Sequence, residues 1–383
     1  MESRNGRRVV ISGVGVVSPC GTGTEEFWTG LAKPVESSTA RRVTGFDPAG
    51  YGLARQEYRR LDRFAQFGLA AAAQALVDAY LLPCVSADSP VRGGERVGVL
   101  IGTGMGGTST YESQVHTLRD RGERQVSPLA VPMVMPNAVA GAVSMRWGLR
   151  GPCETVCTAC ATGTHAIGAA ARWVASGRAD IVVAGGAEAP LTGTSVAAFG
   201  AMRALSPTGL SRPFDVGRDG FCAAEGAGVV VLETLESCLS RGALPYAEII
   251  GTGSTADAFH LTAPAPRGSG AERCMRQALN DAGLPPGEVT HVNAHGTSTP
   301  LNDAAEAVAL AELFGDHQPA VTSVKGVTGH PLGAAGAIEA VAVALTYRNE
   351  LLPPTMGTTV VDPRFDLDVV RGDPRPWDPA PAM

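Results

Sequence analysis

Short apolar runs bounded by turn residues recur along the first half of the chain. They predict buried strands at residues 8–17, 96–102, 181–184 and 226–232. Between the first two runs, Leu61, Phe64 and Leu76 keep a helical spacing and predict one long helix over residues 57–81. Strands that alternate with amphipathic helices are typical of an α/β fold with a buried sheet.

The second half of the chain repeats this alternation. It predicts strands at residues 247–253, 289–294 and 320–324, and helices at residues 269–282, 302–313 and 330–347. Residues 105–150 interrupt the first half with a polar insertion that contains helical pieces, and the second half has no insertion of similar size.

A self-similarity of the sequence connects the two halves. An offset of 165 residues pairs Cys160 with Lys325 and His165 with His330, together with the glycine and alanines that follow each pair. Self-similarity of this kind indicates two copies of one α/β unit.

We therefore expect two pseudo-symmetric halves. Residues 1–243 would carry the candidate nucleophile and the insertion, and residues 244–383 would carry the candidate histidines. Pseudo-symmetric packing would bring corresponding loops together, so Cys160 would meet His295 and His330.

The composition fits a large buried core. The chain has 383 residues, of which 44% are hydrophobic, and its 48 glycines suit closely packed layers. A formal net charge of −6 argues against a general nucleic-acid surface. No uncharged run of about 18 apolar residues predicts a membrane span. The eight cysteines are scattered and no signal peptide precedes the first strand, so we expect reduced thiols in a cytoplasmic protein.

Residues 154–177 carry the candidate nucleophile. A strand-like run ends at Thr158, and a helix rich in glycine and alanine is expected to open at Cys160. A cysteine at a helix N-terminus lies beside free N–H groups and the positive end of the helix dipole, and both stabilise a thiolate. The sequence therefore predicts a reactive Cys160 with an increased thiolate fraction at neutral pH.

Two other motifs overlap this region. Cys153, Cys157 and Cys160 fit the spacing C-x3-C-x2-C of some iron–sulfur sites. The third cysteine opens a small-residue helix and the others lie on or beside a strand, which favours packing roles for Cys153 and Cys157. Residues 102–107 satisfy G-x-G-x-x-G, but they lead into the polar insertion, which favours a tight turn over a dinucleotide site.

Three motifs follow one another in the chain: TACATG around Cys160, NAHGTSTPLND around His295, and VKGVTGHPLGAAGAIE around Lys325 and His330. Together they resemble the β-ketoacyl–acyl-carrier-protein synthases of the elongating kind, over nearly the whole chain. The resemblance implies a thiolase fold, an α/β architecture with αβαβα layers, and a homodimer or close heterodimer. It also implies decarboxylative Claisen condensation of malonyl–acyl-carrier protein with an acyl group held on Cys160, in fatty-acid or polyketide elongation.

The resemblance further implies roles for individual residues. Cys160 would be the acylated nucleophile, and His295 and His330 would donate hydrogen bonds to the developing enolate oxygen, so no metal and no bound cofactor is expected. Lys325 would pair with Glu339 and order the histidines.

Further residues would support or bind the substrates. Glu306 occupies a supporting position, Thr297 and Thr299 match contacts to the phosphopantetheine arm of the carrier protein, and Met105 would project into the acyl pocket.

The expected partner is an acyl carrier protein. Because carrier proteins are acidic, Arg59, Arg60 and Arg203 are candidate docking residues. No nucleic-acid or membrane partner is expected.

Two other functions share this fold. A coenzyme A-dependent thiolase would use a second cysteine near its C-terminus, and none of the eight cysteines lies beyond Cys274. A non-catalytic or chain-length partner subunit of a type II polyketide synthase would typically lack the active-site cysteine, whereas this chain keeps Cys160 with His295, Lys325 and His330.

The end of the second half departs from the family. The first half closes with the strand at residues 226–232, and the second half shows no counterpart. In the family that strand follows a Gly-Phe-Gly-Gly turn that supplies one N–H of the oxyanion hole. We therefore expect an exposed sheet edge or groove beside Cys160.

Overall fold

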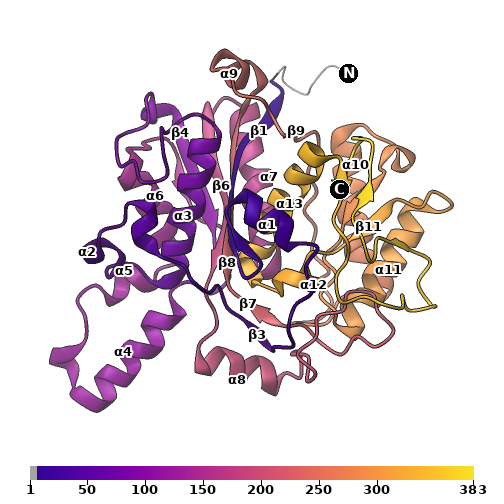
Figure 1. The fold of residues 1–383 in the computed structure, drawn as a ribbon, viewed down its shortest axis with the longest axis horizontal. Coiled ribbons are helices and arrows are strands. Elements are labelled where there is room, and N and C mark those ends of the chain that lie inside the picture. The colour runs from indigo at the N-terminus through magenta and orange to yellow at the C-terminus, as the bar shows by residue number, and fades with distance from the viewer. Residues whose placement is uncertain (1–6) are drawn as a thin grey trace.

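The computed structural model describes residues 7–383 and has one mixed seven-stranded sheet near its centre (Figure 1). Its strands are β1 (Val9–Ser18), β2 (Gly21–Thr22), β4 (Val97–Gly102), β5 (Cys153–Glu154), β6 (Ile181–Glu188), β8 (Gly226–Thr234) and β9 (Ala247–Glu248). They follow the order β2-β1-β8-β6-β4-β5, with β9 paired to β1. β4 is parallel to β6, whereas β8 is antiparallel to both β1 and β6.

A second, smaller sheet belongs to the second half. Its three strands are β10 (His291–Asn293), β11 (Ala320–Thr322) and β13 (Asp368–Val369), and all are parallel. The helices that cover the two sheets are α3 (Arg63–Asp78), α6 (Ala138–Trp147), α7 (Thr162–Ala175), α10 (Ser269–Ala282), α11 (Pro300–Phe314) and α13 (Ala335–Asn349).

Alternating apolar side chains place these helices in layers. Val99 of β4 faces the cluster that contains α3 and α6, whereas the adjacent Leu100 faces the cluster that contains α7 and α13. A third cluster joins α10 and α11 to the second sheet. The layers therefore run helix, sheet, helix, sheet, helix (Figure 1), which is the expected thiolase fold.

The remaining elements are short or peripheral. They are α1 (Thr24–Gly30), β3 (Ala40–Arg41), α2 (Arg55–Tyr58), α4 (Thr108–Arg121), α5 (Ala130–Val134), α8 (Gly193–Ala201), β7 (Ala223–Ala224), α9 (Leu235–Ser240), α12 (Lys325–Thr328), β12 (Leu351–Leu352) and β14 (Arg375–Pro376). α4 and α5 lie in the predicted insertion, and α4 extends away from the body of the molecule (Figure 1). No helix among residues 7–383 is long and apolar enough to cross a membrane.

The two halves pack their first strand on a helix in the same way. An added Cβ at Gly13 or Gly15 of β1 would lie 2.3 or 2.0 Å from a main-chain oxygen of α3. An added Cβ at Gly251 or Gly253 would lie 2.3 or 2.1 Å from a main-chain oxygen of α10. Only glycine permits an approach this close, so each half uses two glycines spaced two residues apart.

Side chains from the same helices bond to the same strands. Each strand N–H that follows one of the glycines donates to a carboxylate or carboxamide of the helix: Val14 to Asp78, Val16 to Gln74, Thr252 to Asp281 and Ser254 to Gln277. The internal repeat is therefore present in hydrogen bonding as well as in sequence.

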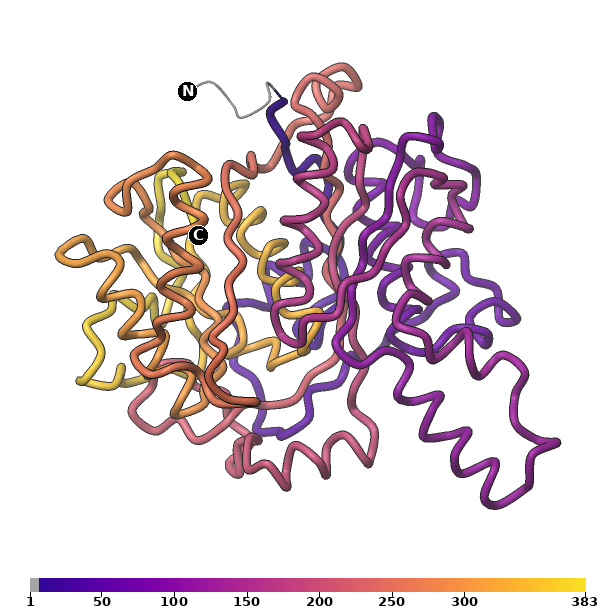
Figure 2. The backbone as a smooth tube through the Cα atoms, turned by 180° about the vertical axis from the view of Figure 1, so that it is seen from behind, coloured from indigo at the N-terminus to yellow at the C-terminus, as the bar shows by residue number. Residues whose placement is uncertain are grey.

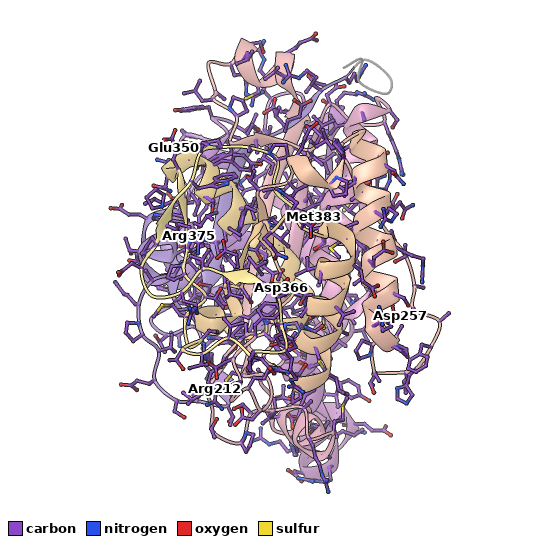
Figure 3. The ribbon with its side chains drawn as sticks, turned by 90° about the vertical axis from the view of Figure 1, so that its right-hand side faces the viewer. Arg212, Asp257, Glu350, Asp366, Arg375 and Met383 are labelled. Atoms are coloured by element: carbon purple, nitrogen blue, oxygen red, sulfur yellow. The ribbon has the colours of Figure 1, made fainter. Side chains whose placement is uncertain are left out.

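The extended segments that pack on α3 and α10 differ in how they pair with neighbouring strands. β1 pairs with β8 from Val9 to Val17. Residues 249–256 are extended (Figure 2), and apart from the Ile249 N–H, which donates to the Val9 carbonyl, they pair with no strand of the described chain. Ile250 in this segment is 47% exposed. Met383 hydrogen-bonds the main chain of His291 and Asn293 in β10 (Figure 3). Among residues 7–383 no counterpart of β8 closes the second half.

Several predicted boundaries are wrong. The strand predicted at residues 247–253 contributes only β9, and the helix predicted from His330 begins at Ala335. Three others are wrong for local reasons. The long helix over residues 57–81 is two helices, because the Asp62 carboxylate accepts the N–H of Phe64 and begins α3 anew. The helix predicted from Asn302 begins at Pro300, with Thr299 as its cap. The strand-like run of residues 154–158 contributes only β5. The division between residues 243 and 244 stays a prediction.

Candidate active site

Cys160 lies in a tight turn that precedes α7. Ala159–Ala161 form a 3-10 turn, and Ala159 has a φ of 50°, a conformation that is costly for any residue but glycine. The Thr162 hydroxyl supports the turn, because it accepts the Thr158 N–H and donates to the Ala159 carbonyl. α7 starts at Thr162 rather than at Cys160, so the thiol lies just before the helix.

The second half of the chain supplies two imidazoles beside this thiol. The Sγ atom of Cys160 lies 3.0 Å from Nε2 of His330. The ring centroid of His295 lies 5.3 Å from that of His330, and the rings are nearly perpendicular at 83°. The main-chain N–H of His330 donates to the Cys222 carbonyl, which fixes its loop on the first half. The structure thus brings together the three side chains that the sequence analysis grouped.

Burial sets the protonation of these groups. It lowers the pKa of His295 and of His330 well below the usual value, and the charge of Lys325 adds to this effect. Both imidazoles are therefore neutral at pH 7. Burial also raises the pKa of the Cys160 thiol, although Lys325 partly opposes the shift. The expected stabilisation of a thiolate is outweighed, so the thiol needs a base when it reacts.

Lys325 is a buried cation with a fixed partner. Its side chain is 1% exposed, and Nζ donates to the His295 carbonyl at 2.6 Å and to a carboxylate oxygen of Glu339. A buried ammonium group is stable only when such partners replace water. The expected Lys325–Glu339 pair is present, and its link to His295 runs through the main chain.

Glu306 supports the same loop from α11. Its carboxylate accepts the N–H groups of His295 and Gly296, and burial raises its pKa to about 7. The Thr297 and Thr299 hydroxyls lie 2.9 Å apart, and Thr299 also caps α11. The loop after β10 is therefore held on both sides of His295.

Glu188 is a site residue that the sequence analysis missed. It ends β6, is completely buried, and accepts four hydrogen bonds, from the Thr103 hydroxyl and from the N–H groups of Gly104, Met105 and Gly333. Burial raises its pKa to about 7, despite these bonds. The available signal was a lone carboxylate at the end of an otherwise apolar run.

The partners of Glu188 belong to different halves. Gly104 borders the Cys160 turn, because a Cβ there would lie 3.8 Å from the Ala159 oxygen. Gly333 follows His330 by three residues. One carboxylate therefore ties the loop beside the nucleophile to the loop that carries His330.

The alternative motifs take other roles. Cys153 and Cys157 are exposed, so the packing roles expected for them are wrong. Among the described residues the one group of candidate metal ligands is Cys160 with His295 and His330. The C-x3-C-x2-C pattern therefore forms no cluster site. The G-x-G-x-x-G run is a tight turn whose N–H groups face Glu188.

Other predicted residues lie at the surface. Met105 is 38% exposed. Arg59, Arg60 and Arg203 are exposed and make no side-chain hydrogen bond or ion pair with residues 7–383. They follow α2 and α8 and are not part of the buried site.

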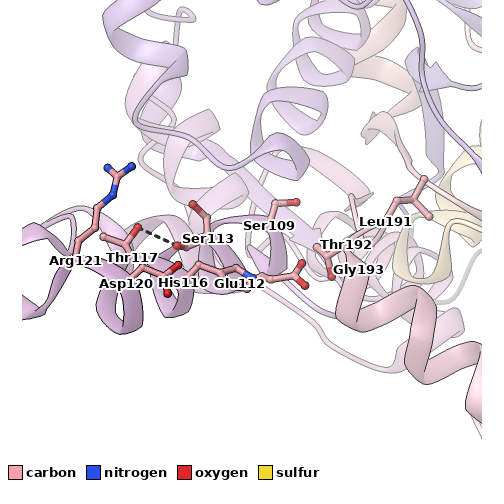
Figure 4. Close-up of a pocket in the computed structure, with 10 residues that line it drawn as sticks. All are labelled: Ser109, Glu112, Ser113, His116, Thr117, Asp120, Arg121, Leu191, Thr192 and Gly193. Carbon is pink, nitrogen blue, oxygen red and sulfur yellow. Dashed lines mark hydrogen bonds between the residues drawn. The ribbon is translucent and has the colours of Figure 1, made fainter.

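An open cavity of about 740 Å³ lies between α4 and α8 (Figure 4). Its lining is mostly polar and includes Glu112, Ser113 and His116. Glu112 accepts the N–H and the hydroxyl of Thr194, which ties the two helices together. None of the predicted catalytic residues lines this cavity.

Two copies of one α/β unit around a shared helical layer make a thiolase fold, and a thiol from one copy that faces two imidazoles from the other is typical of its condensing enzymes. Comparison with known families narrows this class. Residues 32–237 match the β-ketoacyl synthase N-terminal domain, and residues 246–359 match the β-ketoacyl synthase C-terminal domain. The chain belongs to the β-ketoacyl synthase family.

A curated relative supports the same activity. The 3-oxoacyl-[acyl-carrier-protein] synthase 2 of Staphylococcus aureus (strain COL) is 42% identical, over 98% of this chain and 94% of its own length. The chain is thus an acyltransferase of the β-ketoacyl–acyl-carrier-protein synthase type.

Solved structures of ketosynthases have a similar shape. The ishigamide ketosynthase/chain length factor superimposes with a TM-score of 0.87 at 33% identity, over 97% of this chain and 94% of that chain. A type II polyketide synthase acyl-carrier protein in complex with its ketosynthase, bound to the hexaketide, gives 0.85 at 32% identity, with the same coverage.

Proposed function

We propose that Cys160 holds the growing acyl chain as a thioester, and that His295 and His330 stabilise the enolate formed from malonyl–acyl carrier protein. The observation that carries this assignment is the 3.0 Å contact between Cys160 Sγ and His330 Nε2, with the ring of His295 beside it. Two neutral imidazoles in a buried site offer N–H donors without a metal ion.

The first step transfers the acyl group. The thiol proton of Cys160 moves to His330 as sulfur attacks the acyl thioester, and the proton then leaves with the phosphopantetheine thiol. His330 suits this shuttle because it is neutral before and after the step.

The second step forms the carbon–carbon bond. Malonyl thioester loses carbon dioxide, and the enolate oxygen accepts hydrogen bonds from His295 and His330. The enolate carbon attacks the acyl thioester and expels the Cys160 thiolate, which takes up one proton from solvent and regenerates the thiol. Lys325 and Glu306 act through the loop of His295, which they hold by its carbonyl and its N–H.

Substrate delivery would use the outer residues. Thr297 and Thr299 lie on the loop after His295 and would bond the phosphopantetheine arm, and Met105 would border the acyl chain. Arg59, Arg60 and Arg203 have no acidic partner in the described chain and would receive the acidic carrier protein.

The α4 arm supports pairing with a second ketosynthase-like chain, either identical or a chain-length subunit. α4 has no buried residue, and its exposed apolar positions Tyr111, Val115 and Leu118 follow helical spacing. β5 adds an exposed edge to the main sheet. Exposed apolar patches of this kind mark interaction surfaces. Light scattering of Val115→Asp against the wild type, alone and with a chain-length subunit, tests both pairings.

A non-catalytic role is disfavoured because the thiol and both imidazoles are retained in contact. The decisive experiment is mass spectrometry of Cys160 after exposure to a series of acyl–carrier proteins. An acyl adduct on Cys160 that turns over with malonyl–carrier protein supports the proposal, and its chain length reports the substrate. An unmodified Cys160 across the series, in a folded protein, overturns it.

A further inference from the structure

The catalytic side chains also form a set of metal ligands. Within the described chain, the ligand atoms of Cys160, His295 and His330 all lie within 4.8 Å of one another. A tetrahedral zinc site has Zn–S near 2.3 Å and Zn–N near 2.0–2.1 Å, which places its ligand atoms about 3.4–3.6 Å apart. The Sγ–Nε2 distance of 3.0 Å is already below this range. An ion therefore needs side-chain shifts of only about 1 Å.

The loops that carry the two rings are fixed in place. The main-chain N–H of His330 donates to the Cys222 carbonyl, and the main-chain N–H of His295 donates to the Glu306 carboxylate. Imidazole nitrogen is a common zinc ligand, so the two rings offer suitable donors from loops that need little further ordering.

Three charged side chains act on the thiol. Lys325 has the largest electrostatic effect on Cys160 and favours its thiolate, whereas Glu339 and Glu188 oppose it. Lys325 and Glu339 are paired with each other, so their charges largely offset at the site. The donor set of one sulfur and two nitrogens suits zinc, whereas magnesium and calcium prefer oxygen ligands.

We propose that Cys160, His295 and His330 bind one Zn²⁺ ion and that this ion is a reversible inhibitor of the enzyme. Binding replaces the thiol proton of Cys160 with a sulfur–zinc bond and releases that proton to solvent. The two imidazoles give a lone pair each, and water takes the fourth position. The ion then occupies the nucleophile and both enolate donors, so acylation and decarboxylation stop together.

The first experiment needs no variant and no turnover. Chelator-stripped protein is treated with iodoacetamide, with and without ZnCl2, and alkylation of each cysteine is followed by mass spectrometry. We expect zinc to protect Cys160 and leave the exposed Cys84 reactive, EDTA to restore reactivity, and MgCl2 to have no effect. Equal alkylation of Cys160 with and without zinc would overturn the proposal.

The second experiment identifies the ligands. Co²⁺ in a tetrahedral site with one thiolate gives a near-ultraviolet sulfur-to-metal band and intense visible bands. We expect Cys160→Ser to remove the sulfur band and His295→Ala or His330→Ala to weaken the visible bands, whereas the control Cys84→Ser keeps the full spectrum. Circular dichroism of each variant checks folding. A sulfur band that survives Cys160→Ser would assign the metal to another thiol and refute the site.

The inference and the proposed function fail separately. Zinc protection in a chain that never forms an acyl-enzyme leaves the metal site standing and removes the proposed role of Cys160 as the acylated nucleophile. An active enzyme in which zinc does not protect Cys160 removes the metal site and leaves the proposed function standing.

Discussion

The molecule contains the same packing of a strand on a helix twice. β1 packs on α3, and the extended segment 249–256 packs on α10. Each strand approaches its helix through two glycines, and each helix bonds two strand N–H groups through a carboxylate and a carboxamide. They differ in strand pairing: β1 is paired with β8 along nearly its whole length, whereas residues 250–256 pair with no strand among residues 7–383. The packing between strand and helix is thus independent of whether the sheet is completed.

The loops before the central helices differ more. The first half places Cys160 there, next to an imidazole, and the second half places Lys325 at the corresponding position, where it is buried and paired with Glu339. The same backbone position serves chemistry in one copy and support in the other.

The largest effect on activity is expected when Cys160, the nucleophile of the first half, is removed. Cys160→Ala should lower condensation by roughly 10⁴-fold or more, the range seen when a nucleophile is removed. Intact-mass measurement should show no acyl adduct, whereas Cys84→Ala should acylate normally. Cys160→Gln should lose condensation and retain decarboxylation of malonyl–carrier protein. An adduct of normal yield on Cys160→Ala would contradict the assignment.

In the second half, loss of the Lys325–Glu339 pair should lower the stability of the folded protein. Lys325→Met leaves the partly buried Glu339 without its partner, which should lower the free energy of unfolding by about 3–5 kcal/mol. Urea denaturation measures this loss. Lys33, the other lysine of the chain, is exposed, so the control variant Lys33→Met should change the free energy of unfolding little. The double variant Lys325→Met/Glu339→Met should recover part of the loss, and a further loss would disprove the pairing argument.

Glu188 joins the two copies, and its effect should depend on pH. The folded carboxyl titrates near 7 and the unfolded one near 4.5, so the folded state keeps a proton that the unfolded state has lost. The stability of the wild type relative to Glu188→Gln should therefore fall by about 3 kcal/mol as pH rises from 4.5 to 7, then stay level. Denaturation curves of both proteins across this range test it. Asp303, Glu306 and the buried histidines are present in both proteins, so their contributions to the pH dependence cancel. A stability difference that does not change with pH would refute the raised pKa of Glu188.

The smallest effect compares the two strands directly. Gly13→Ala and Gly251→Ala create the same contact, 2.3 Å from a helix carbonyl oxygen. β1 is held by β8 and cannot retreat, so Gly13→Ala should cost about 3 kcal/mol, near the upper end for overpacking. The strand at residues 249–256 has a free outer edge and can move, so Gly251→Ala should cost about 1 kcal/mol. Equal losses of thermal stability would mean that the open edge gives no freedom.

The sequence predicted the parts of this molecule that local motifs encode. Helix α10 has its predicted bounds, and the group of Cys160, His295, His330 and Lys325 assembles because each residue follows a strand end of the repeated unit. The sequence could not predict the direction of the pKa shift of Cys160, since burial in the folded protein outweighs the effects that favour the thiolate. Glu188 was missed because its partners lie about 85 and 145 positions away.

The position of α13 has a consequence for synthesis on the ribosome. This helix comes from the last fifth of the chain, yet it covers the same face of the main sheet as α7. All seven strands of that sheet leave the ribosome before α13 does. Until then, the face of the sheet that α7 and α13 share is covered by α7 alone. The N-terminal half therefore cannot complete its fold while it is being made, and the nascent chain should depend on chaperones until Asn349 has emerged.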